Sequence, residues 1–366
     1  MKITRKPAHQ VRVAVKRKKA EETPLPSALL SSGCTLLNLA VSDTTDGCFR
    51  PGSYYFLVGD SSSGKTFFSM TCFAEAVRHP IFKNYRLVYD NVEDGMLMDV
   101  RRLFGAKVEE KVEPPSMEDG APKHSETIED FYDHVDNLIQ EGRPFIYVLD
   151  SMDGLTSDAE DAKFEEHKKA RAEGKEAAGS YGDGKAKKNS AGLRRVLAGL
   201  RRTGSILVVI CQTRDVLNAG PWGPKKTRSG GHALRFYATV EIWTSLRGQI
   251  SKTVRGKTRK LGTKVALKIA KNRVTGKLPE VETAIFPSYG IDDDGSLIDF
   301  LVAEKWWPKA GAKGIKAKEL GVALPREKLL KLVDNGKRPK LLKAARRCWA
   351  RVQEESALQG RKPRYE

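Results

Sequence analysis

The sequence is poor in cysteine, and its cysteines follow no recognised pattern. There are five in 366 residues, an odd number that is widely scattered and contains no C-x-x-C pair. This arrangement argues against a disulfide framework or a zinc ribbon and is typical of a protein from a reducing compartment. A chain of this length also buries enough apolar surface to fold without such cross-links.

Long apolar segments are absent as well. The longest apolar run in the body of the chain is Ile206–Cys211, far shorter than the ~20 residues with which a helix crosses a bilayer. Residues 1–20 are basic and lack the apolar stretch of a secretory signal. The 32 glycines and 17 prolines form no short repeat, which excludes a collagen-like chain. We therefore expect a globular cytoplasmic protein.

Acidic residues are scarce in three segments, and these segments concentrate the positive charge of the chain, which is +19 overall. Residues 1–24 carry eight basic and two acidic side chains, residues 214–277 carry sixteen and two, and residues 301–366 carry eighteen and seven. Concentrated Lys and Arg suit a polyanion, because each neutralised phosphate releases bound counterions. The distribution favours a nucleic-acid partner over a basic surface that serves only solubility.

Between residues 27 and 300, short apolar strands alternate with helical segments. The expected strands are 54–58, 87–91, 145–150 and 206–211, and the expected helices are 65–78, 94–104, 126–141 and 189–202. This order predicts an α/β fold with a mostly parallel sheet covered on both faces. After Cys211 the pattern indicates an antiparallel extension, with strands expected at 236–246, 264–271 and 280–286.

The chain divides into three expected parts. Residues 1–24 form a basic N-terminal tail whose alternating stretch, Val11–Val15, could pair with the sheet edge of a neighbouring subunit. Residues 25–300 form the α/β core, and within it residues 156–188 are an insertion that cannot build a core of its own. Residues 301–366 form a small, basic and helical C-terminal region, in which we expect Trp306, Trp307 and Trp349 to pack a small helical lobe rather than to contact DNA.

A phosphate-binding loop lies between the first expected strand and the helix that follows it. The residues Gly59-Asp60-Ser61-Ser62-Ser63-Gly64-Lys65-Thr66 fit the pattern G-x-x-x-x-G-K-[ST]. In such a loop, backbone N–H groups and the helix N-terminus face a phosphate, the lysine reaches the β- and γ-phosphates, and the hydroxyl binds Mg²⁺. We expect Lys65 and Thr66 to fill these last two roles.

Carboxylates follow two neighbouring expected strands. Asp150 comes directly after an apolar run, at the edge of the sheet where ligands of open α/β sheets gather, and we expect it to hold Mg²⁺ together with Thr66. Glu93 is our choice for the base that orients water, with Asp90 and Asp94 as rivals. Spacing alone does not separate the three, because each could instead cap the next helix.

Several segments in this order resemble the bacterial RecA recombinases. They are the phosphate loop, the Tyr-Asp-x-x-Glu strand end, Val-Leu-Asp-Ser, Cys211-Gln212-Thr213-Arg214, Ser229-Gly230-Gly231-His232-Ala233-Leu234-Arg235-Phe236-Tyr237-Ala238 and Lys271-Asn272-Arg273. The phosphate loop is generic, whereas the Gly-Gly-x-Ala-Leu-x-Phe-Tyr-Ala segment is specific. The resemblance covers roughly residues 30–300 and implies a RecA-like ATPase core that uses ATP and Mg²⁺.

The resemblance also implies individual roles. Glu93 matches the water-activating glutamate, and Gln212 matches the glutamine that senses the γ-phosphate and relays it to the next loop. Lys271 and Arg273 match a basic pair that reaches the ATP of a neighbouring subunit. On sequence alone, these two residues would be read as exposed strand residues. Residues 157–188 and 214–231 correspond to the first and second DNA-binding loops, although acidic side chains offset the basic ones in the first.

The composition of the second loop agrees with this assignment. Arg214, Lys225, Lys226 and Arg228 flank Trp222, and cations beside an exposed aromatic ring suit single-stranded DNA, whose bases stack and whose phosphates need neutralising. The alternative is that Trp222 folds onto the body of the protein. The chain departs from the family at both ends, where a basic tail replaces the usual N-terminal helix and strand and the C-terminal region is short. Such divergence resembles that of virus-encoded relatives, which would place the protein in the host cytoplasm.

Three functions remain open. The first is an ATP-dependent, single-stranded-DNA-binding recombinase that self-associates into filaments and drives homologous pairing and strand exchange, including exchange with duplex DNA, in recombination and repair. The second is a related ring helicase or accessory ATPase. The third is a DNA-binding protein in which ATP acts only as a switch for strand annealing or protection.

Overall fold

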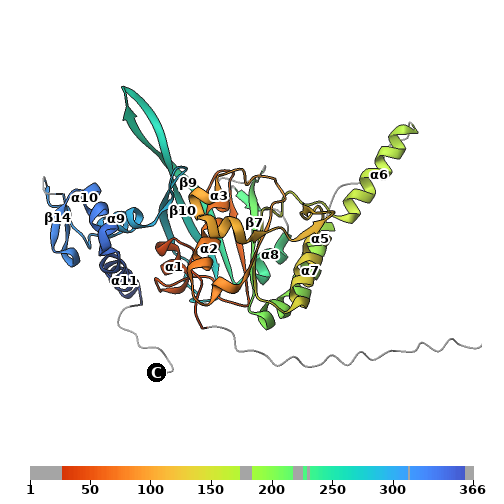
Figure 1. Cartoon of the computed structure of the whole chain (residues 1–366), viewed down its shortest axis with the longest axis horizontal. Coiled ribbons are helices and arrows are strands. Elements are labelled where there is room, and N and C mark those ends of the chain that lie inside the picture. Colours follow the sequence, from red (N-terminus) through yellow and green to blue (C-terminus); the bar gives the residue numbers. More distant parts are fainter. Residues whose placement is uncertain (1–26, 174–183, 217–225, 229–230, 312–313, 359–366) are drawn as a thin grey trace, which may run out of the picture.

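A computed structural model of the chain describes residues 27–173, 184–216, 226–228, 231–311 and 314–358. Its centre is one large mixed sheet (Figure 1). In spatial order the strands are β12 (Gly290–Asp292), β11 (Glu280–Phe286), β10 (Lys257–Asn272), β9 (Val240–Val254), β1 (Ser53–Gly59), β7 (Ile206–Asp215), β6 (Phe145–Leu149), β2 (Arg86–Asp90) and β3 (Val112–Glu113). The short strand β8 (Lys226–Arg228) pairs with β7.

The sheet has a parallel half and an antiparallel half, as the sequence predicted. Strands β9, β1, β7, β6, β2 and β3 run parallel, and β9 to β12 are antiparallel to one another. Side chains alternate between two cores: Tyr55 and Leu57 of β1 point into one, and Tyr54, Phe56 and Val58 into the other. The predicted α/β fold class is therefore confirmed.

Helices cover both faces of the sheet. On one face lie α1 (Thr35–Ser42), α2 (Lys65–Arg78), α3 (Val100–Phe104) and α4 (Ala106–Lys111), and on the other lie α5 (Ile128–Glu141), α7 (Gly184–Thr203) and α8 (Gly231–Tyr237). Helix α6 (Asp158–Ala172) has no buried residue and projects from the body (Figure 1). Among the residues within the described ranges, none of the helices has the length and apolar character needed to cross a membrane.

Two expected elements differ from the structure. The helix expected at 94–104 begins only at Val100, where the Asp99 carboxylate accepts a hydrogen bond from the N–H of Arg102 and caps it. The strand expected from residue 236 begins at Val240, because the chain before it is helix α8. Leu234 and Ala238 are both buried there, and their spacing of four residues suits a helical face better than a strand.

The C-terminal region packs against the core rather than standing apart. It contains α9 (Asp293–Ala303), the hairpin of β13 (Ile315–Ala317) and β14 (Val322–Leu324), α10 (Arg326–Leu332) and α11 (Arg338–Glu355). Trp306 and Trp307 both donate to Glu319, and Trp307 and Trp349 are buried, as expected. The predicted boundary at residue 300 falls inside α9. The division into a core and a C-terminal region stays a prediction. The predicted tail, residues 1–24, lies outside the described residues.

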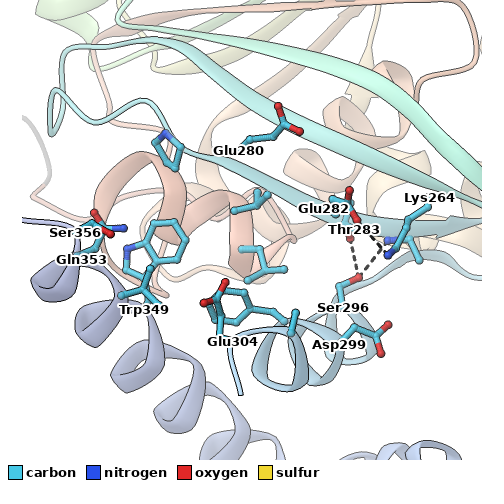
Figure 2. A pocket seen from close by; sticks show the side chains of 17 residues that line it. Lys264, Glu280, Glu282, Thr283, Ser296, Asp299, Glu304, Trp349, Gln353 and Ser356 are labelled. Atoms are coloured by element: carbon cyan, nitrogen blue, oxygen red, sulfur yellow. Dashed lines mark hydrogen bonds and ion pairs between the residues drawn. The ribbon is translucent and has the colours of Figure 1, made fainter. Parts of the chain in front are cut away.

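A pocket of about 530 Å³ lies between the core and this C-terminal region. Figure 2 shows Trp349 and Glu304 on its helical side and Glu280 and Glu282 on strand β11. The small hairpin of β4 (Ser116–Glu118) and β5 (Ala121–Lys123) completes the described strands. No residue of the phosphate loop lines the pocket between the core and the C-terminal region.

Candidate nucleotide and nucleic-acid site

The phosphate loop joins the end of β1 to the start of α2. Gly64 has a φ of +89°, which favours glycine, and a side chain at Gly59 would collide with the Thr244 hydroxyl at 1.9 Å. Both glycines are therefore required by the local geometry. The loop borders a pocket of about 350 Å³ whose other wall is formed by strands β10 and β11.

The ammonium group of Lys65 bridges this loop. Its Nζ donates to the carbonyl oxygens of Gly59 at 2.9 Å and of Asp60 at 2.7 Å. Burial lowers the pKa of Lys65, and the nearby carboxylate of Asp150 opposes this shift. An ammonium group held at the loop by carbonyl oxygens has the charge and position to exchange them for phosphate oxygens.

The two predicted metal ligands meet at the sheet edge. The Thr66 hydroxyl donates to Asp150 Oδ2 at 2.7 Å, and the Tyr89 hydroxyl donates to the same oxygen at 2.7 Å. Burial raises the pKa of Asp150, so a cation at this position would stabilise its charged form. In the part of the chain that the structure describes, no cluster of three or more acidic, His or Cys side chains could cage a metal. A hydroxyl and a carboxylate beside a triphosphate do suit Mg²⁺, which takes most of its ligands from phosphates and water.

The sheet order brings Glu93 and Gln212 together. Gln212 is the cross-strand partner of Gly59, and its Nε2 donates to the two carboxylate oxygens of Glu93 at 3.0 and 3.2 Å. The Ser151 hydroxyl also donates to Glu93. Glu93 is exposed at the mouth of the site, where a water molecule has access.

The rival carboxylates have other surroundings. Asp90 is fully buried and accepts hydrogen bonds from the Ser125 hydroxyl and the Tyr147 hydroxyl, each at 2.6 Å. Burial acts to raise the pKa of Asp90, but these donors and His124 lower it overall. Asp94 is exposed, with a left-handed backbone. Asp90 is thus a structural anion without access to water, and these contacts favour Glu93 as the base.

A comparison with known proteins now identifies the family. The family model described as the RecA N-terminal domain matches residues 13–292. The chain belongs to the RecA family.

Individual relatives agree with this assignment. Protein RecA of Cytophaga hutchinsonii is 26% identical over 309 residues, which cover 81% of this chain and 76% of the relative. Protein RecA of Mycobacterium ulcerans is 27% identical over 296 residues, covering 80% and 75%, respectively. Protein RecA of Enterococcus faecalis is 26% identical over 307 residues, covering 83% and 78%.

In this RecA-family chain, Lys271 and Arg273 lie away from the chain's own phosphate loop. Lys271 pairs across the sheet with Glu241, which lies beside Phe56, three residues before Gly59. Its Nζ donates to the carbonyl oxygens of Arg235 and Phe236, each at 2.7 Å, and Arg273 also donates to Phe236 at 2.8 Å. Burial, followed by the charge of Arg273, lowers the pKa of Lys271 to about 8.

The second predicted DNA loop of this RecA-family chain continues directly from Gln212. Strand β7 runs on to Asp215 and pairs with β8, which places Arg214 beside Thr227 and Asp215 beside Lys226. Lys226 and Arg214 each approach a carboxylate of the nucleotide site, with Nζ 2.5 Å from Asp60 Oδ2 and NH2 3.8 Å from Asp153 Oδ1, respectively. Trp222 and Lys225 lie outside the described residues.

Arg228 faces inward in this structure. Its guanidinium is 3.4 Å from the buried carboxylate of Glu241 and lies over the ring of Phe56, and its side chain is only 13% exposed. The described arrangement therefore gives Arg228 no open path to DNA, and its predicted contact would require the β8 segment to move. Of the first predicted loop, α6 and the start of α7 are described, and they lie apart from the phosphate loop.

Sequence reasoning missed a basic arm. Strands β9 and β10 continue beyond the sheet as a two-stranded hairpin (Figure 1), and residues 247–262 of this hairpin contain no acidic side chain. Arg255 and Gly256 form its two-residue turn, both with positive φ. Five exposed cations make no ion pair with any residue that the structure describes: Lys252, Arg255, Lys257, Arg259 and Lys260. The absence of acidic residues around the Arg255-Gly256 pair was the available signal.

Proposed function

We propose that this protein is an ATP-dependent recombinase that assembles on single-stranded DNA and promotes homologous pairing and strand exchange. The observation that carries the proposal is the continuity of one strand. Gln212 contacts the base Glu93 beside the phosphate loop, and the next three residues of β7 pair with the β8 segment of the DNA loop. A change at the nucleotide therefore has a covalent path of a few residues to the DNA loop.

ATP and Mg²⁺ are the expected ligands of the site. Lys65 and the backbone of residues 59–66 would hold the phosphates, and Thr66 and Asp150 would hold the metal, which supplies charge neutralisation at the transferring phosphate. Glu93 would orient the attacking water. Gln212 would exchange its hydrogen bond with Glu93 for one with the γ-phosphate. This exchange couples hydrolysis to the DNA loop.

Self-association follows from the positions of Lys271 and Arg273. Lys271 lies on β10 and Arg273 directly after its end, both away from the phosphate loop of their own subunit, so a catalytic role requires the ATP of another copy. Filament formation on DNA would supply that neighbour. The lowered pKa of Lys271 in the free subunit is consistent with a side chain that gains its anionic partner only on assembly.

The DNA surface of the proposed recombinase has two described basic parts. One is the base of the second loop, at Arg214 and Lys226. The other is the basic arm, in which five exposed cations make no ion pair with a residue that the structure describes, whereas Arg247 at its base pairs with Glu280 and Glu282. Their concentration of charge supplies the salt-dependent attraction that nucleic-acid backbones require.

Electron microscopy of the full chain with single-stranded DNA and a slowly hydrolysed ATP analogue tests the proposal. Filaments on the DNA, absent without nucleotide, are expected, together with ATP hydrolysis that DNA stimulates and strand exchange with a homologous duplex. Closed rings that unwind forked duplexes would favour a helicase. Annealing that survives when Glu93→Gln abolishes turnover would favour an ATP-switched binding protein.

A further inference from the structure

Asp60, the second residue of the phosphate loop, has a side chain that serves no part of the loop itself. Its backbone carbonyl accepts hydrogen bonds from Lys65 Nζ at 2.7 Å and the Ser63 hydroxyl at 2.6 Å, which are contacts within the loop. Its carboxylate instead points to the strands that lead into the predicted DNA loop. There, Lys226 Nζ donates to both oxygens, at 2.6 and 2.5 Å, and the Thr213 hydroxyl donates to Oδ1.

These two partners of Asp60 lie on the two strands at the base of the predicted DNA loop. Thr213 directly follows Gln212, and Lys226 is the first residue of β8, paired across the hairpin with Asp215. Partial burial acts to raise the pKa of Asp60, but the Lys226 ammonium and the Thr213 hydroxyl outweigh it and lower the pKa overall. Asp60 is therefore a charged acceptor, and while Lys226 is paired with it, the lysine is not available to a DNA phosphate.

We propose that Asp60 is a latch that, without nucleotide, ties the base of the DNA loop to the phosphate loop and so keeps the affinity for single-stranded DNA low. This inference rests on the proposed function. A γ-phosphate at Lys65 offers Gln212 a new hydrogen-bond acceptor. Because Thr213 is joined to Gln212, movement of Gln212 pulls on the Thr213–Asp60 contact and frees Lys226 for DNA.

The expected size of the effect follows from the exposure of the pair. The side chains of Lys226 and Asp60 are 45% and 32% exposed, and ion pairs near the surface stabilise by amounts that correspond to about two- to fivefold in an equilibrium constant. Removing the latch should therefore raise DNA affinity without nucleotide by about two- to fivefold. The ratio of affinities with and without an ATP analogue should fall correspondingly.

The test measures binding of a fluorescent oligothymidine by anisotropy, with and without a slowly hydrolysed ATP analogue. Asp60→Asn is compared with Asp46→Asn, which removes the same charge from an exposed residue that precedes β1 and lies outside the phosphate loop. Asp60→Asn should lower the nucleotide dependence, and Asp46→Asn should not. In the Lys226→Gln background, Asp60→Asn should have no further effect on binding without nucleotide, because the cation that Asp60 withholds from DNA is already absent.

A second measurement needs no DNA. The rate at which an amine-reactive acetylating reagent modifies Lys226, followed by mass spectrometry, reports whether the ammonium is paired. Slow modification without nucleotide, faster modification with the analogue, and fast modification of Asp60→Asn in both conditions are expected.

Several results would overturn the latch. The first is that Asp60→Asn changes DNA affinity equally with and without the analogue. The second is that Asp60→Asn has the same effect in the Lys226→Gln background as in the wild-type protein. The third is that Lys226 is modified at the same rate in the Asp60→Asn variant as in the wild-type protein. Wild-type protein that binds no single-stranded DNA with the analogue would instead refute the proposed function. In that case the modification rates would still decide whether Asp60 holds Lys226.

Discussion

Neutralising the basic arm should remove a defined part of the DNA affinity. The variant replaces the five exposed cations of the arm with glutamine, which removes each charge and leaves a polar side chain in its place: Lys252, Arg255, Lys257, Arg259 and Lys260. None of the five makes an ion pair with a residue that the structure describes, so their loss leaves no partner charge exposed. The fold should therefore be unaffected, and the melting temperature provides the check. ATP-analogue binding is measured separately, because Lys260 also lines the pocket beside the phosphate loop.

The magnitude follows from counterion release. If all five cations meet phosphates, the slope of log affinity against log salt should become shallower by about 4.5 for duplex DNA and about 3.5 for single strands. Raising salt from about 50 to about 200 mM would then weaken the wild-type protein by about 500-fold more than the variant on duplex and by about 100-fold more on single strands. If fewer cations meet phosphates, the difference in slope between the wild-type protein and the variant is proportionately smaller. The difference in slope therefore gives the number of phosphate contacts that the arm makes.

A matched control removes five exposed cations from helices and turns away from the phosphate-loop edge of the sheet: Lys83, Lys107, Arg194, Arg201 and Arg202. Arg201 and Arg202 stand at the end of α7, just before the amino end of β7. The assay is fluorescence anisotropy at four or more salt concentrations with both DNA forms. Identical slopes for wild type and arm variant, or equal losses in the control, would refute the role of the arm.

Three further outcomes concern the nucleotide site. Lys65→Ala should abolish the nucleotide dependence of DNA binding, because the phosphates lose their direct cation; filter binding with and without the analogue measures it. Glu93→Gln should lower ATP hydrolysis by about 10²- to 10⁴-fold, because the base that orients the attacking water is lost. DNA binding with ATP should persist. A coupled-enzyme assay measures the hydrolysis and fluorescence anisotropy measures the binding. An equimolar mixture of Lys65→Ala and Arg273→Ala subunits should recover about a quarter of wild-type hydrolysis. In a random assembly, about one neighbour pair in four places an intact phosphate loop of one subunit against an intact Arg273 of the next.

Each of these has a clear contrary result. A DNA affinity of Lys65→Ala that still rises with the analogue by the wild-type factor would contradict the first. Loss of DNA binding in Glu93→Gln would show that the carboxylate supports the loop rather than the water. No recovery in the mixture, with each variant folded and able to form mixed assemblies, would place Arg273 outside the catalytic site.

The sequence alone determined the elements whose signals are local. The phosphate loop, the apolar strand before Asp150 and the helix that begins at Lys65 each occupy one short segment, and the structure has them where the pattern predicted. The parallel order of the strands also follows from the alternation of strand and helix, because parallel strands need a crossover connection. Local signals failed at the antiparallel half, where α8 replaced part of an expected strand.

Tertiary structure decided what depends on residues far apart in the chain. Asp90, Glu93 and Asp94 are indistinguishable by spacing, and only the burial of Asp90 under Ser125 and Tyr147 separates its role from that of Glu93. The contacts of Asp60 with Lys226 and of Gln212 with Glu93 join residues more than 100 positions apart. Such contacts arise because β1, β7, β6 and β2 lie side by side, and a one-residue change of register would point each of these side chains to the other face.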